Sequence, residues 1–349
     1  MGLRLPRWAM GRRVWGLVHL GLGLAFSIGL GWLAVRGLAW EEVSRHLQRF
    51  SPTYGFLALA IFLAGMVLRA YRWQVLFVQE SVPLRHLFVV QNVGIGVNNL
   101  SPWRVFSEAI QFALLTARYR VQGGVALATL GVERVLDLVA SAMLLVLGVV
   151  LVPKFQGLVA VLVLALGLAL VSVVVVRLLS WASTKRWVYR IPFLGPFAAA
   201  TAAVERARGR LLWALFLTFA YWGTVGVTGW VVGRGLGLEM DPWVVTVVII
   251  ATLYISTALP ALPAAVGTFE FAMVSILGFF AVPQASAFSY GLLVHVILFL
   301  PPVVLAVALL PREWWTLRGA ASRARQWKAP RAGDLAQGAA SHDEGGTPG

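Results

Sequence analysis

Residues 121–152 read VQGGVALATLGVERVLDLVASAMLLVLGVVLV, and this stretch decides the fold. Its second part, Leu138–Val152, carries no charge over about 22 Å of helix, because an α-helix rises about 1.5 Å per residue. About 20 mostly apolar residues are enough for a helix to cross the hydrocarbon core of a bilayer. The stretch therefore predicts a transmembrane helix that carries three charged residues near one end, namely Glu133, Arg134 and Asp137.

The composition of the whole chain agrees with a membrane protein. Of its 349 residues, 59% are apolar and only 12% are charged, whereas soluble domains have roughly 45–50% and about 25%. This composition excludes a soluble enzyme. The absence of cysteine excludes disulfides and thiolate metal sites, and the five histidines form no metal-binding pair in the sequence. We therefore expect no metal and no cofactor. The net charge of +15 is typical of basic cytoplasmic loops, and we expect no nucleic-acid partner.

Five other stretches have a similar length and apolar character. They are Val14–Val35, Thr53–Leu68, Phe155–Leu179, Leu211–Gly233 and Ser286–Leu310. The first follows several arginines, as a signal peptide would. It is longer than the usual signal core of roughly 7–15 residues and ends in no small-residue cleavage site. We therefore expect a retained membrane anchor.

Two further apolar regions, Leu84–Ala117 and Pro242–Ala281, are interrupted by proline and polar residues. Each could form two crossings or one re-entrant hairpin. If both are hairpins and the N-terminus is cytoplasmic, the cytoplasmic segments hold 23 of the 29 Lys and Arg residues and the outer segments hold 5. Cytoplasmic loops of membrane proteins are rich in Lys and Arg. The charges therefore favour an all-α polytopic fold with six transmembrane helices and two re-entrant hairpins, in the plasma membrane, with both termini cytoplasmic.

This arrangement divides the chain into two halves of the same design. We expect a basic cytoplasmic N-terminus (1–13), a first membrane repeat (14–152), a second membrane repeat (153–310) and a basic, mostly disordered cytoplasmic tail (311–349). Three full crossings in each half would turn the second repeat upside down relative to the first. Proline-broken segments at matching positions of two inverted halves indicate a binding site of the transporter type.

The first hairpin region carries polar residues around a proline. They are Asn98, Asn99, Pro102, Arg104 and Glu108. Pro102 lacks an N–H and disfavours helix in the residue before it, so a turn is expected there. Arg104 and Glu108 are four residues apart, which permits a local ion pair. Alternatively, Arg104 presents its planar guanidinium to a phosphate, which its geometry suits.

The charged group of residues 133–137 has a net charge of −1. Glu133 and Asp137 share one helix face, and Arg134 reaches Asp137 three residues on. One carboxylate therefore needs another cation. Arg69, Arg72 and Arg104 are the candidates. The group is either a structural ion-pair network that ties the helix to the first hairpin, or a relay for protons or lipid headgroups, because ionisable residues inside a membrane are functional candidates.

The second hairpin region combines two prolines with a glycine and an acid, namely Pro260, Pro263, Gly267 and Glu270. Gly267 permits a positive φ where the chain turns back. Glu270 is expected at the start of a short helix. There it is either a cap for the free N–H groups of that helix or a buried acid that faces a cavity. For His295, in the last span, we expect a hydrogen bond to a neighbouring helix rather than a metal.

At these same residues the sequence resembles the transmembrane domain of lysylphosphatidylglycerol synthases and its stand-alone relatives, the flippase-like integral membrane proteins. Three motifs carry the resemblance across roughly residues 14–310. The motifs are Asn98-Asn99-Leu100-Ser101-Pro102-Trp103-Arg104 with Glu108, Val132-Glu133-Arg134-Val135-Leu136-Asp137-Leu138, and Pro260-Ala261-Leu262-Pro263 with Gly267-Thr268-Phe269-Glu270. The chain departs from the family pattern at three positions: Ser107, Ala264 and Ala265 stand where the family has glycine.

The resemblance implies translocation of a lipid or a lipid-linked precursor. It argues against lipid aminoacylation, because only 39 residues remain from Pro311 on. The implied partners are membrane lipids with an anionic headgroup. The residues that we expect to bind the headgroup are Arg69, Arg72, Asn98, Asn99, Arg104, Glu108 and Glu270. Two alternatives are a membrane enzyme, for which no catalytic set is evident, and a non-transporting scaffold for a lipid- or glycan-modifying enzyme.

Overall fold

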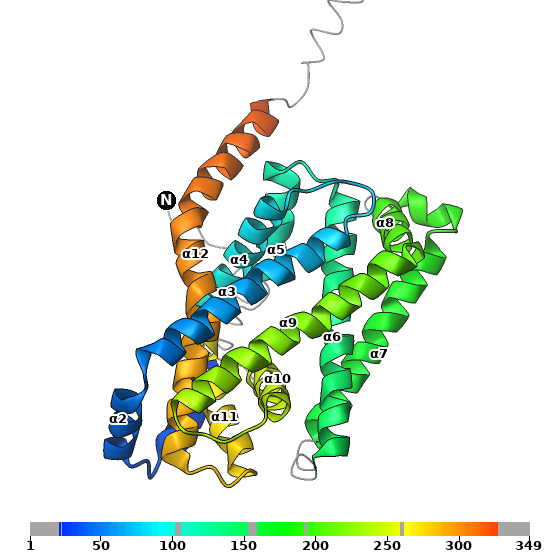
Figure 1. Ribbon diagram of the computed structural model, residues 1–349. Helices are drawn as coiled ribbons and strands as arrows, with labels where there is room; N and C mark the ends of the chain where they lie inside the picture. The colour runs from blue at the N-terminus through cyan, green and yellow to red at the C-terminus, as the bar shows by residue number, and fades with distance from the viewer. Residues whose placement is uncertain are drawn as a thin grey trace, which may run out of the picture.

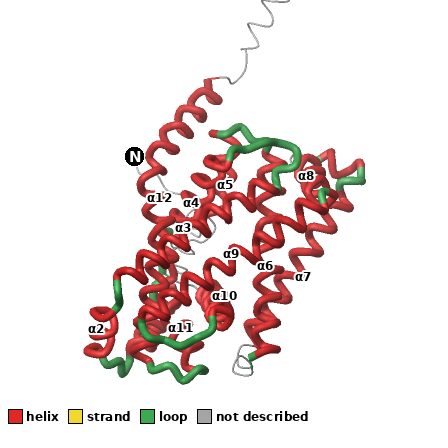
Figure 2. Tube along the Cα trace, viewed as in Figure 1, coloured by secondary structure: helices red, strands yellow, loops and turns green. Residues whose placement is uncertain are grey.

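The computed structural model describes residues 21, 23–101, 106–152, 159–191, 194–258 and 262–326. These residues form helices joined by short loops, and the described ranges contain no strand (Figures 1 and 2). The first helix spans Gly23–Val35. It is followed by α2 (Trp40–Arg49), α3 (Pro52–Val75), α4 (Leu84–Leu100), α5 (Phe106–Ala113) with a π-helical turn (Leu114–Arg118), and α6 (Gly123–Leu151). The second part of the chain contains α7 (Val159–Ala182), a 3-10 turn (Arg186–Arg190), α8 (Leu194–Arg206), α9 (Arg208–Gly235), α10 (Pro242–Ala258), a 3-10 turn (Pro263–Ala265), α11 (Thr268–Gly278) and α12 (Gln284–Gln326).

Five of these helices are long and apolar enough to cross a membrane: α3, α6, α7, α9 and the part of α12 up to Pro311. They coincide with five of the predicted spans and confirm an all-α, multi-pass membrane protein. The remaining predicted span, Val14–Val35, begins outside the described residues. Its described part, Gly23–Val35, is bent by 85° against α2, and this pair would make a sixth span.

Helices α3 and α9 cross the middle of the molecule side by side (Figure 1). Small residues allow this close approach. A Cβ atom added to Gly65 on α3 would lie 2.5 Å from the Thr224 hydroxyl oxygen on α9. Apolar surface gives little drive for helix association inside lipid, so close backbone packing at small residues is the usual means of joining transmembrane helices.

The short helix α4 packs along α12, although the two are far apart in the sequence. Gly96 makes this possible, because a Cβ atom there would overlap the carbonyl oxygen of Pro302. The amide nitrogen of Asn99 also donates to the Phe299 carbonyl over 3.4 Å. The first proline-broken region is thereby fixed against the last long helix.

The two breaks expected in the apolar regions fall between α4 and α5 and between α10 and α11. Pro102, Arg104 and Pro260 lie outside the described residues, so their predicted roles stay predictions. After the second break, Pro263 opens a 3-10 turn. Ala264, Ala265 and Gly267 then have φ angles of +57°, +61° and +84°. Ala264 and Ala265 are the two alanines for which the resemblance implies glycine, and the left-handed region costs about 1–2 kcal/mol for each residue with a Cβ atom.

Candidate functional site

An ion cluster between α3 and α6 is the most buried charged feature of the described residues. Arg72 and Glu133 are both 0% exposed, and Arg72 Nη2 lies 2.6 Å from Glu133 Oε1. The other guanidinium nitrogen of Arg72 donates to the Asp137 carboxylate and lies 3.3 Å from the Thr218 hydroxyl on α9. Gln91 on α4 donates to Glu133 Oε1 over 2.7 Å. The cluster therefore joins four helices, including α4 of the first proline-broken region.

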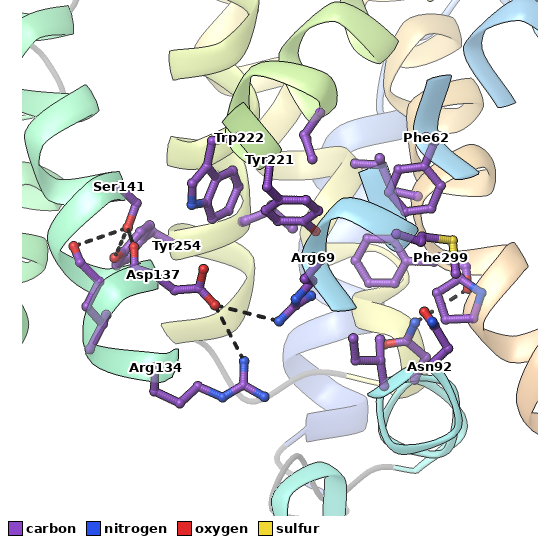
Figure 3. A pocket seen from close by; sticks show the side chains of 18 of the residues that line it. Phe62, Arg69, Asn92, Arg134, Asp137, Ser141, Tyr221, Trp222, Tyr254 and Phe299 are labelled. Carbon is purple, nitrogen blue, oxygen red and sulfur yellow. Dashed lines mark hydrogen bonds and ion pairs between the residues drawn. The ribbon is translucent and has the colours of Figure 1, made fainter. Parts of the chain in front are cut away.

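Two further arginines surround the same acids. Arg69, one turn before Arg72, places Nε 3.5 Å from Glu133 Oε1 and Nη2 3.6 Å from Asp137 Oδ2. Arg134 lies 3.9 Å from Asp137 Oδ2 and 2.8 Å from Glu108 Oε1 on α5. Figure 3 shows Asp137 between Arg69 and Arg134. Three arginines thus face two carboxylates, of which Glu133 is fully buried and Asp137 is 16% exposed. Glu108, which is 46% exposed, balances the remaining charge from the rim.

This cluster forms one wall of a cavity of about 560 Å³ between the helices. The volume lies in the usual range for small-molecule sites, about 300–1,000 Å³. Its polar and charged lining comes from five helices. These residues are Arg69, Asn92, Asn99, Arg134, Asp137, Ser141, Tyr221, Trp222 and Tyr254. Tyr254 and Ser141 share a hydrogen bond of 2.7 Å across α10 and α6.

The rest of the lining is apolar and reaches a lipid-facing helix. It includes Met66 and Phe62, one and two turns before Arg69 on α3, and Leu164 and Leu168 on α7. Leu164 and Leu168 line the cavity, and both side chains are more than 40% exposed. Helix α7 packs on α6 and α8, and no comparable packing joins it to α9 among the described residues. The cavity therefore has a charged end and an apolar end beside α7.

A second acid–base pair lies on α11 and α12, and neither of its residues lines the cavity. Glu270 Oε1 is 2.5 Å from His295 Nδ1, and both side chains are less than a tenth exposed. Glu270 Oε2 accepts a hydrogen bond from the Gly267 N–H over 2.8 Å, so Glu270 caps the α11 N-terminus, one of the two roles that the sequence left open. His295 Nε2 lies 2.8 Å from the Ala264 carbonyl oxygen. His295 is thus bonded to neighbouring elements, as the sequence predicted.

The structure brings some of the predicted residues together and separates others. Arg69 and Asn99 line the cavity, and Arg72 lies behind its wall. Glu108 binds Arg134, while Asn98 has a buried side-chain oxygen without a hydrogen-bond partner. Glu270 belongs to the second pair and not to the cavity lining.

Sequence reasoning missed most of the aromatic lining and the neutral polar partners. Tyr221, Trp222 and Tyr254 line the cavity, and Gln91 binds Glu133. The chain has 15 tryptophans and 7 tyrosines, so residue type alone does not single out these three. Only helix pairing, which the sequence does not state, places α9 and α10 opposite α6.

A family model described as the lysylphosphatidylglycerol synthase TM region matches residues 20–306. The matched interval contains the ion cluster, the cavity lining and the Glu270–His295 pair. No curated protein matches the chain.

Proposed function

Because the chain belongs to the family of the lysylphosphatidylglycerol synthase TM region, we propose that it translocates a lipid or a lipid-linked precursor and is not an enzyme. In this proposal an anionic headgroup binds in the cavity beside Asp137. The observation that carries the proposal is the division of this cavity, within a membrane protein, into a charged end and an apolar end. A lipid has the same division into headgroup and chains.

The charges at the cavity favour a phosphate group. Arg69 and Arg134 both line it, and Asp137 holds them on either side of one carboxylate. Arginine binds phosphate with a planar fork of N–H donors. Buried N–H groups of Arg134 and Trp222, two residues of the lining, have no hydrogen-bond partner, so a small shift of these side chains would offer donors to a ligand rich in acceptors. Arg72 and Glu133 would hold Asp137 in place from behind.

The remaining predicted headgroup residues fit this proposal to different degrees. Asn99 lines the cavity on the α4 side. Glu108 forms an ion pair with Arg134, and this pair would have to break before Arg134 could bind a phosphate. Arg104 stays a prediction from the sequence. Asn98 and Glu270 would take part only after a rearrangement, because neither lines the cavity in this state.

The apolar end gives the acyl chains a path. Leu164 and Leu168 belong to the cavity wall, and α7, which carries them, is exposed along most of its length. A lipid could therefore keep its chains in the bilayer while its headgroup lies between the helices. This arrangement avoids moving a charge through hydrocarbon without compensation.

We also propose that the fold is an inverted-topology repeat with two re-entrant hairpins. The order of helices supports it: Gly23–Val35 to α6 and α7 to α12 are each six helices, with a short second helix and a fourth helix of 17 residues. A helix of 17 residues spans about 26 Å, less than the hydrocarbon core of about 30 Å, and α5 and α11 are shorter still.

The packing between the halves supports the same repeat. Helix α4 packs on α12 while α10 packs on α6, and α3 packs on α9. Each short fourth helix thus contacts the last long helix of the other half. We also propose that the protein lies in the plasma membrane with both termini in the cytoplasm. The charged end of the cavity would then open towards the cytoplasm.

The test is transport of a fluorescent short-chain phosphatidylglycerol in vesicles of phosphatidylcholine and phosphatidylglycerol. Wild-type protein should move the lipid between leaflets, and Arg134→Gln should lower the rate about tenfold, as expected for one lost charge-assisted hydrogen bond of about 1.5 kcal/mol. Arg177→Gln is the matched control, because it breaks the Arg177–Glu205 ion pair on α7 and α8, outside the cavity. A wild-type protein without transport would contradict the proposal and favour the scaffold alternative.

A further inference from the structure

Two acid–base pairs occupy the same place in the two sets of six helices. Glu108 is the third residue of α5, and Glu270 is the third residue of α11. The partner of each is the twelfth residue of the next long helix, Arg134 in α6 and His295 in α12. Both acids therefore start the short helix after a break, and both bases lie on the helix that follows.

The two pairs differ in accessibility. Arg134 and Glu108 are 35% and 46% exposed, whereas His295 and Glu270 are 9% and 8% exposed. Arg134 lines the cavity, and His295 does not. Phe299, one turn beyond His295, lines the cavity and packs edge-on against the imidazole, with ring centroids 4.5 Å apart. One pair is thus open to the cavity, and the other lies behind an aromatic ring.

The polar atoms of the closed pair, Glu270 and His295, all have hydrogen-bond partners within the protein. A carbonyl oxygen only accepts, so His295 Nε2 donates to Ala264. His295 Nδ1 faces Glu270 Oε1, and Glu270 Oε2 already accepts from Gly267. One proton therefore lies between Nδ1 and Oε1, and the pair is neutral as a whole. Such internal compensation is needed, because a buried charge without a partner is strongly destabilising.

From this equivalence we infer that Glu270 and His295 form a second headgroup site, which binds the phosphate of the same lipid when the cavity opens to the opposite leaflet. The inference rests on the proposed transport function. In each site the carboxylate takes the place of the phosphate while the site is empty. The lipid phosphate displaces Glu108 from Arg134 on one side of the membrane, and it displaces Glu270 from His295 on the other. Phe299 has to move for the second site to open.

The experiment separates binding in the present state from transport. Binding of the fluorescent phosphatidylglycerol to the detergent-solubilised protein reports the Arg134 side, and transport in vesicles needs both sites. We expect His295→Leu to keep wild-type binding and to lower transport about tenfold, as for the loss of one charge-assisted hydrogen bond. Tyr290→Phe is the matched control, since it removes another buried polar group of α12, with no hydrogen-bond partner.

If His295→Leu does not fold, His295→Gln replaces it, because its amide can still donate to the Ala264 carbonyl. The expected result is the same loss of transport with binding retained. A histidine variant that transports like wild type, or one that loses binding and transport together, overturns the second site. A wild type that does not transport removes the proposed function itself, so the two failures are distinguishable.

Discussion

The two halves of the molecule bury charge in different ways. In the first half, Arg72 is shared by Glu133 and Asp137, with Arg69 and Arg134 close by, and the group borders the cavity. In the second half, Glu270 has one side-chain partner, His295, and the pair lies behind Phe299. The first arrangement keeps arginines available to a ligand, because several cations share few carboxylates. In the second arrangement, every donor already has a partner.

We expect the largest loss of stability at Arg72, because the carboxylates of Glu133 and Asp137 both depend on this residue. Arg72→Met would leave Glu133 and Asp137 with less compensation, and breaking a buried pair costs about 3–5 kcal/mol. Unfolding in detergent should show a loss of this size. Arg210→Met is the control, because Arg210 donates a single hydrogen bond, to the Phe77 carbonyl, and should cost much less. Equal losses in the two variants would mean that the cluster is solvated.

In the second half, we expect the two substitutions of the Glu270–His295 pair to lower the free energy of unfolding by different amounts. His295→Leu leaves the Ala264 carbonyl and Glu270 without their partner, and hydrogen bonds to charged groups contribute about 1.5–3 kcal/mol. Glu270→Gln should cost less, because an amide can accept from Gly267 and donate to a neutral His295. Thermal unfolding of both variants in detergent measures the difference. A larger loss for Glu270→Gln would show that the fold needs the negative charge itself.

Much of the first arrangement could be predicted from the sequence, and little of the second. Glu133, Arg134 and Asp137 stand together in one span, so their charge imbalance is visible without a structure. The choice of Arg72 as the main cation depends on where α3 lies relative to α6, and the sequence offered three candidates. His295 and Glu270 are 25 residues apart on different helices, and nothing in the local pattern pairs them. The five long spans followed directly from apolar length.

In the turn before Glu270, we expect a substitution that raises the free energy of unfolding, by less than the losses described above. Ala264 has a φ of +57°, a conformation that glycine adopts without the Cβ penalty. Ala264→Gly should therefore raise the free energy of unfolding by about 1 kcal/mol, after allowing for the extra flexibility of glycine in the unfolded chain. Ala272→Gly, within helix α11, should lower it by about 0.5–1 kcal/mol. A loss of stability in Ala264→Gly would show that this backbone conformation is not strained.

The smallest effect on stability is expected for the open pair of the first half. Glu108 and Arg134 are 46% and 35% exposed, and partly exposed ion pairs contribute about 0–1 kcal/mol. A double-mutant cycle with Glu108→Gln and Arg134→Gln should give a coupling energy in that range. The corresponding cycle at Glu270 and His295 should give a larger one, because that pair is shielded from water.

Added phosphatidylglycerol sharpens the same comparison. A ligand that binds only the folded protein stabilises it in proportion to the logarithm of its concentration over its dissociation constant. The lipid should therefore raise the melting temperature of the wild type and of Glu108→Gln, which frees Arg134, more than that of Arg134→Gln. An equal rise in all three proteins would mean that Arg134 does not hold the headgroup. A coupling energy at Glu108–Arg134 as large as that of the closed pair would show instead that both pairs serve the fold.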